Sequence, residues 1–315
     1  MLTRLISLAF AAVLALTAPV SAQLSVVATT GMIADAAQEI GGEHVSVRAL
    51  MGPGVDPHAY RQTRSDIAAM VRADLVLWHG LFLEAQMEPF FEDLSRRRSV
   101  IAVAGGMPTE VLLANEDHPD RFDPHVWMNP GLWQLVVVEI RDALIAADPG
   151  NRDVYLTRTE RYLAQLETVS DYATGVLSTI PEPQRVLLTA HDAFNYFGRA
   201  YGFEVLGVQG ISTESEAGLA RIAELVELLV TRDIRAVFVE SSVSDRNMRA
   251  LIEGAAARGH VVQIGGELFS DAMGQPGTYE GTYLGMIDHN ATTIARSLGG
   301  TAPERGMAGL LSAGM

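Results

Sequence analysis

The chain contains 315 residues, of which 48% are hydrophobic, and it carries a formal net charge of −15. This length is enough for one large or two medium-sized domains with buried cores. The acidic balance excludes an electrostatic nucleic-acid-binding role, because no basic stripe is present to neutralise phosphates.

The first residues have the features of an export signal. Arg4 supplies a positive charge, residues 5–16 form an apolar run, and Ala22 ends a stretch of small residues that a signal peptidase would cut. We therefore expect cleavage after Ala22. The alternative, an uncleaved membrane anchor, is disfavoured because the apolar run is shorter than the roughly 20 residues of a membrane span. The sequence contains no cysteine, so we expect no lipid attached through one. These features predict a periplasmic protein without a direct membrane anchor; secretion into the medium is the alternative.

The next part of the chain alternates strand and helix patterns. Strands are predicted where short apolar runs occur, and helices where apolar residues recur at helical spacing. The predicted strands are 24–29, 44–50, 75–78 and 100–103, and the predicted helices are 32–40, 63–71 and 84–94. This alternation predicts a mainly parallel sheet with helices on both faces.

The second half repeats this architecture without a detectable sequence repeat. The predicted strands are 186–190, 203–208, 236–240 and 261–264, and the predicted helices are 194–200, 216–231 and 245–258. The fold class is therefore α/β, with two Rossmann-like lobes whose sheets are mainly parallel.

A long helix is predicted between the halves, over residues 153–178. Apolar side chains keep a roughly helical period there, no proline interrupts it, and Pro181 and Pro183 follow its end. Twenty-six residues would span about 39 Å at about 1.5 Å per residue, enough to join two lobes as a rigid strut. We therefore divide the chain into a signal peptide (1–22), an N-terminal lobe (23–150), a linking helix (151–182) and a C-terminal lobe (183–315).

Four potential metal ligands lie at the carboxyl ends of predicted strands. His58 follows the second strand, His125 follows the fourth, His191 ends the fifth and Asp271 follows the eighth. Open α/β sheets bind ligands beyond the carboxyl ends of their strands, so these residues can meet across one interlobe cleft. Imidazole nitrogens and a carboxylate oxygen suit a first-row divalent cation. A site closed by four protein ligands favours holding a metal over doing chemistry with it.

Other interpretations of these residues remain open. A single histidine beside proline and aspartate is often only a turn or capping residue. His79 also ends a strand, and His118 in an acidic loop could bind metal loosely. Glu214 and Glu240 lie near strand ends and are candidates to orient the imidazoles through their other nitrogens; the alternatives are a helix-capping Glu214 and a solvated Glu240.

Several motifs together resemble the TroA-like group of ABC-transporter solute-binding proteins, which take up manganese, zinc or ferrous iron. The resemblance covers almost the whole chain after the signal peptide and is carried by residues 54–60, 123–128, 189–197, 209–214 and 266–273. It implies that His58, His125, His191 and Asp271 coordinate the metal. It also implies a two-lobed fold, a linking helix and a membrane permease as partner.

The identity of the metal is left open by the residues. Relatives with glutamate in place of the third histidine are usually manganese proteins, and zinc proteins often carry a long histidine-rich loop. This chain has His191 but only a short loop at 115–123. Three histidines and one aspartate suit tetrahedral Zn²⁺, whereas a bidentate Asp271 would accommodate Mn²⁺, with Fe²⁺ also possible.

The function predicted is capture of Zn²⁺ or Mn²⁺ and delivery to an ABC-transporter permease by a monomeric protein. A periplasmic metal chaperone or buffer would use the same site. A zinc metalloenzyme is disfavoured, because catalytic zinc usually keeps an open coordination position and no His-Glu-x-x-His segment is present.

Overall fold

The computed structural model describes residues 22–115 and 118–312. The signal-peptide prediction for 1–22 therefore lies outside the described residues, apart from Ala22, as does part of the acidic loop before His125. Within the described residues, no helix is both long and apolar enough to cross a membrane.

The N-terminal half contains a parallel four-stranded sheet with the strand order β2-β1-β3-β4. The strands are β1 (Leu24–Ala28), β2 (Val45–Ala49), β3 (Leu75–Trp78) and β4 (Ser99–Ala102), and the helices between them are α1 (Gly31–Gly41), α2 (Arg64–Arg72) and α3 (Glu88–Ser95). The strand β1 is central, because Val26 pairs with Val47 on one side and with Leu75 on the other. This confirms the parallel sheet predicted from the alternation of elements.

The helix α4 (Pro130–Ala147) was not predicted from the sequence. Asn129 caps its N-terminus by accepting a hydrogen bond from the backbone N–H of Gly131, and the helix packs against α1 and α5. Its sequence is apolar over most of its length and includes the β-branched run 136–138. Such a run weakens the helical signal, because β-branched residues favour strands and an apolar run has no distinct period.

The C-terminal half contains two parallel strand pairs, β5-β6 and β7-β8. The strands are β5 (Val186–Thr189), β6 (Glu204–Gly207), β7 (Ala236–Glu240) and β8 (Gln263–Leu268), and the helices are α6 (Asn195–Tyr201), α7 (Leu219–Thr231), α8 (Arg246–Ala257) and α9 (Tyr283–Ser297). Because β5 also contacts β7, these two small sheets lie next to each other. The two-lobed α/β architecture is thus as predicted.

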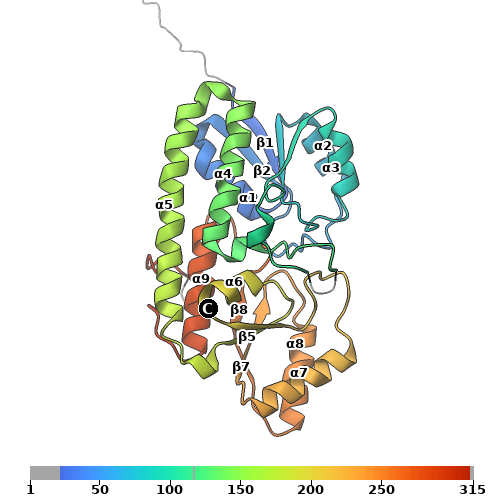
Figure 1. The fold of residues 1–315 in the computed structure, drawn as a ribbon, viewed down its shortest axis with the longest axis vertical. Helices are drawn as coiled ribbons and strands as arrows, with labels where there is room; N and C mark the ends of the chain where they lie inside the picture. Colours follow the sequence, from blue (N-terminus) through green and yellow to red (C-terminus); the bar gives the residue numbers. More distant parts are fainter. Residues whose placement is uncertain (1–21, 116–117, 313–315) are drawn as a thin grey trace, which may run out of the picture.

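The helix α5 (Arg152–Leu177) is the predicted linking helix, displaced by one residue. It runs along one side of both lobes, with α1 and α4 beside its first part and α9 beside its last part (Figure 1). Its buried apolar side chains belong to a single hydrophobic cluster that includes Val26 of the first lobe and Ile287 of the second. The lobes are therefore joined by a continuous core as well as by the helix.

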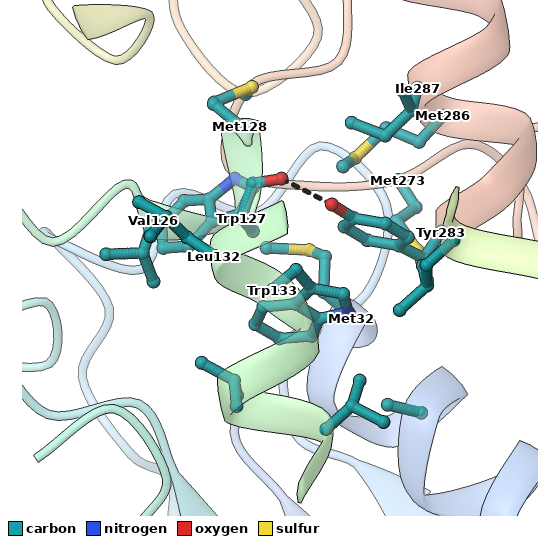
Figure 2. Close-up of a cluster of buried hydrophobic side chains, with 14 of the residues drawn as sticks. Met32, Val126, Trp127, Met128, Leu132, Trp133, Met273, Tyr283, Met286 and Ile287 are labelled. Carbon is teal, nitrogen blue, oxygen red and sulfur yellow. Dashed lines mark hydrogen bonds between the residues drawn. The ribbon is translucent and has the colours of Figure 1, made fainter. Parts of the chain in front are cut away.

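Part of this core is drawn in Figure 2. Trp133 of α4 stacks on Tyr283 of α9, with ring centroids 5.3 Å apart and planes inclined at 17°. The hydroxyl of Tyr283 donates a hydrogen bond of 2.7 Å to the carbonyl oxygen of Trp127. These contacts between the lobes favour small, local movements over a wide hinge opening, since packed interfaces shift rather than deform.

Leu166→Ala tests the contribution of α5 to the shared core. Leu166 is fully buried, and removing its side chain should lower the free energy of unfolding by about 2–5 kcal/mol, as for other large-to-small core substitutions. The measurement is urea unfolding followed by circular dichroism. Gln165→Ala, at an exposed position of the same helix, is the matched control and should change stability by less than about 0.5 kcal/mol. Equal effects of the two substitutions would contradict a structural role for this face of α5.

Candidate metal centre

His58 lies in the loop between β2 and α2, where its side chain is only 3% exposed. The preceding Asp56 shapes this loop, because its Oδ1 accepts a hydrogen bond of 2.9 Å from the backbone N–H of His58. An aspartate that binds a backbone N–H two residues ahead closes a local turn. The Asp-Pro-His sequence therefore directs the imidazole inward.

His125 is positioned by a second Asp-Pro-His sequence. Asp123 Oδ1 accepts from the backbone N–H of His125 at 2.9 Å and also contacts its Nδ1 at 2.7 Å. Both side chains are fully buried. When Nδ1–H donates to this carboxylate, the lone pair of Nε2 points away from Asp123 and is free to bind a cation.

His191 follows β5 and is held by a carboxylate from β7. Glu240 Oε1 accepts from the backbone N–H of His191 at 2.8 Å, and Oε2 lies 2.5 Å from Nδ1. Both side chains have no exposed surface. Glu240 therefore leaves Nε2 as the nitrogen available to a metal, in the same way that Asp123 does for His125.

Asp271 lies in the loop that follows β8, and this loop is anchored on both sides. Asn290 of α9 accepts from the backbone N–H of Phe269 at 2.9 Å and donates to its carbonyl oxygen at 2.8 Å. The indole N–H of Trp127, on the other lobe, donates to the carbonyl oxygen of Ser270 at 2.8 Å. The backbone immediately before Asp271 is thus fixed relative to both lobes.

The four predicted ligand residues converge across the interlobe cleft. One ligand atom from each lies within 4.8 Å of the others. The Nε2 atoms of His58 and His125 are 3.2 Å apart, and Asp271 carboxylate oxygens lie 3.4 Å from His125 Nε2 and 3.2 Å from His191 Nε2. His58 Nε2 lies farther from the carboxylate, at 3.9 Å from Asp271 Oδ2. A tetrahedral ion with bonds of about 2.1 Å separates its ligand atoms by about 3.4 Å, so the shorter spacings suit such an ion and small side-chain shifts would bring the remaining one into range.

Three of the polar atoms at the centre of this cluster lack hydrogen-bond partners. His191 Nε2 and both carboxylate oxygens of Asp271 are buried without one. Such unsatisfied groups are costly unless something else compensates them, and a divalent cation would satisfy all of them together. The donor set and its burial therefore fit a transition-metal ion.

The electrostatics of the cluster also favour a positive charge at its centre. Burial lowers the pKa of His58 to about 3, so its imidazole is neutral and can act as a ligand. Burial acts in the same direction on His125, but Asp123 and Asp271 outweigh it and raise its pKa to about 9. Burial would raise the pKa of Asp271, yet the adjacent His191 and His125 hold it well below its usual range. Without a metal, protons supply the positive charge that these carboxylates require.

Glu214 does not occupy the position that we predicted for it. Its side chain is exposed, and its carboxylate accepts a hydrogen bond of 2.6 Å from Gln86. The carboxylate that contacts Nδ1 of His125 belongs to Asp123, which was not predicted to orient a histidine. The available signal was the spacing in Asp-Pro-His, because an aspartate two residues before a histidine can reach both its backbone N–H and its ring.

His79, which the topology alone would admit as a ligand, supports the His125 loop. It is buried, and its Nε2 donates to the carbonyl oxygen of Pro124 at 2.7 Å. Glu84 braces the backbone at this point by accepting hydrogen bonds from Thr29 Oγ1 (2.6 Å) and from the N–H groups of His79 (2.8 Å) and Gly80 (3.2 Å). The buried carboxylate thus stabilises the backbone that presents His79 to the metal-centre loop.

Comparisons with known proteins place the chain among metal-uptake proteins. The model of the periplasmic zinc-uptake complex component A family, ZnuA, matches residues 26–297. The chain is 47% identical to the manganese-binding lipoprotein MntA of Bacillus subtilis over 276 residues, covering 88% of this chain and 90% of that protein. It is 46% identical to the zinc-binding protein TroA of Treponema pallidum over 273 residues, covering 87% and 88%, respectively. The solved structure of periplasmic TroA matches with a TM-score of 0.86, covering 88% of this chain and 99% of that chain.

Glu240→Gln tests whether this carboxylate orients His191. An amide cannot accept from both the backbone N–H and Nδ1–H of His191 as the two carboxylate oxygens do, so the ring would lose its preferred tautomer. We expect metal affinity to fall about 10- to 100-fold, as for other partners of metal-binding histidines. The measurement is competition for Zn²⁺ and Mn²⁺ against a chelating dye. Glu253→Gln, at an exposed position of α8, is the control; similar affinities of the two variants would contradict the role of Glu240.

Glu84→Gln tests the buried carboxylate that supports His79. Burial raises the pKa of Glu84 from 4.5 to about 7. The folded protein therefore favours the protonated carboxyl of Glu84. The free energy that this preference adds to folding is complete below about pH 4.5 and is lost as the pH rises through about 7. Between these limits, the free energy of unfolding of the unsubstituted protein should fall relative to that of Glu84→Gln by up to about 3 kcal/mol. Urea unfolding of metal-free protein across this range measures the difference; a constant difference at every pH would contradict the prediction.

Proposed function

This chain belongs to the ZnuA family of periplasmic zinc-uptake components, and we propose that it captures Zn²⁺ or Mn²⁺ and delivers the ion to an ABC-transporter permease. The observation that carries this proposal is the buried cluster of His58, His125, His191 and Asp271. We propose these four residues as the ligands of the transported ion. Asp123 and Glu240 would orient two of the imidazoles through Nδ1.

The metal is proposed from the chemistry of the site. Three imidazoles and one carboxylate are a ligand set that favours Zn²⁺, and intrinsic affinity for such nitrogen and oxygen ligands is higher for Zn²⁺ than for Mn²⁺. Both oxygens of Asp271 are buried and without hydrogen-bond partners, so a bidentate carboxylate could complete a five-coordinate Mn²⁺ site. The two relatives of nearly equal identity, MntA and TroA, are named for manganese and zinc, respectively.

Capture and release would depend on small movements of the ligand loops. The four ligand residues are at most 3% exposed, so an ion can enter or leave only when loops of the two lobes separate. The helix α5 and the shared core oppose a wide opening. We therefore propose that metal binding draws the loops of both lobes together and that the permease recognises this loaded form.

Binding, rather than catalysis, is the role that the coordination supports. Four protein ligands leave no position for the water molecule that catalytic zinc usually keeps. We further propose that the protein is an unanchored monomer in the periplasm. MntA is named a lipoprotein, whereas the sequence of this chain contains no cysteine to which a lipid could be attached.

Elemental analysis of protein purified from its own periplasm tests this function directly. We expect about one zinc or manganese ion per chain, because the residues form a single closed coordination sphere. Replacing His191 by alanine should weaken binding by more than the roughly 10- to 100-fold effect of losing an orienting partner, since a ligand itself is removed.

His118→Ala is the matched control, because this histidine is exposed in the loop before the centre. It should leave metal content unchanged. Absence of bound metal, together with no tight binding of added Zn²⁺ or Mn²⁺ to metal-stripped protein, would contradict the proposed function. That result would direct attention to an organic ligand in the same cleft.

A further inference from the structure

Thr213 joins the two lobes beside the candidate metal centre. Its hydroxyl donates a hydrogen bond of 2.5 Å to Asp56 Oδ2. The other oxygen of the same carboxylate accepts from the backbone N–H of His58 at 2.9 Å. Asp56 therefore contacts the backbone of a proposed ligand in the N-terminal lobe and a side chain of the C-terminal lobe at the same time.

The segment that carries Thr213 is attached to the loop of His191. The backbone N–H of Gln209 donates to the carbonyl oxygen of Ala190 at 3.0 Å, and that of Asp192 donates to Gly210 at 3.3 Å. The side chain of Gln209 is buried and donates to the carbonyl oxygen of Ser215 at 3.0 Å, which braces the turn around Thr213. Movement of Thr213 is thus coupled to the backbone on both sides of His191.

We propose that Thr213 is a positioning residue for metal retention, whose hydrogen bond to Asp56 holds His58 in place relative to His191. This inference rests on the proposed function of metal capture. Release must separate the ligands of the two lobes, and that movement also pulls Thr213 away from Asp56. The acceptor is a half-buried carboxylate, so the bond is stronger than one between neutral groups and opposes the separation.

The backbones of the two lobes are also close at this edge of the cleft. Gly54, in the His58 loop, has a φ of +70°, and a Cβ placed on it would lie 3.3 Å from the carbonyl oxygen of Ser241. The Thr213–Asp56 bond therefore lies where the two lobes are already in close contact. A second interlobe bond, between Gln86 and Glu214, lies on the surface, where water competes for both side chains.

Metal dissociation from two Thr213 variants tests this role. Thr213→Val removes the hydroxyl but keeps the branched shape, whereas Thr213→Ser keeps the hydroxyl. The mature protein is loaded with Zn²⁺, and separately with Mn²⁺, and mixed with excess chelator in a stopped-flow instrument. We expect Thr213→Val to release metal about tenfold faster, which corresponds to about 1.4 kcal/mol. Thr213→Ser should release it at nearly the original rate.

Thr231→Val is the matched control, because the Thr231 hydroxyl bonds only within α7, to the carbonyl oxygens of Glu227 and Leu228. Equal dissociation rates for Thr213→Val and Thr231→Val would overturn the proposal. An equal acceleration in Thr213→Val and Thr213→Ser would also overturn it, because the hydroxyl would then not be responsible. If the unsubstituted protein binds neither metal, the proposed function itself fails. If it binds metal normally but Thr213→Val releases the metal at the original rate, only the proposed role of Thr213 fails.

Discussion

The rest of the structure depends on one constraint: three imidazole nitrogens meet the carboxylate of Asp271 in a space that is almost closed to water. Buried groups of this kind are unfavourable without a compensating positive charge. Asp123 and Glu240 add negative charge around the centre and fix the nitrogens that face it. Protons on His125 and His191, or a divalent cation among the four residues, can supply this positive charge, which suits a site that alternately fills and empties.

The fold supports this arrangement by joining the lobes through a hydrophobic core on one side and through individual polar contacts on the other. Along α5, a continuous core that includes Trp133 and Tyr283 connects the two lobes. At the far edge of the cleft, individual polar contacts such as that between Thr213 and Asp56 cross between the lobes. Breaking the core would expose much apolar surface, whereas breaking a polar contact exchanges it for water. Movement is therefore expected at the cleft edge and in the ligand loops.

Much of the fold could be predicted from local pattern, since the alternation of apolar runs and helical periods specifies a parallel α/β architecture. The boundaries of α5 were predicted to within one residue, because its buried positions follow one helical period and prolines follow its end. The helix α4 was missed. Its apolar, β-branched sequence is compatible with either a strand or a helix, and its packing between α1 and α5 resolves that ambiguity.

The sequence by itself determined which residues could form the centre, because the carboxyl ends of parallel strands share one edge and His58, His125, His191 and Asp271 follow such ends. Their coordination of a metal stays a prediction. Only the tertiary structure decided that Glu240 meets the Nδ1 of His191, 49 residues away, and that Glu214 bonds to Gln86 instead of to a histidine. The reason is physical: strand topology confines a ligand to an edge, but which carboxylate reaches which imidazole depends on the packing of side chains from distant segments.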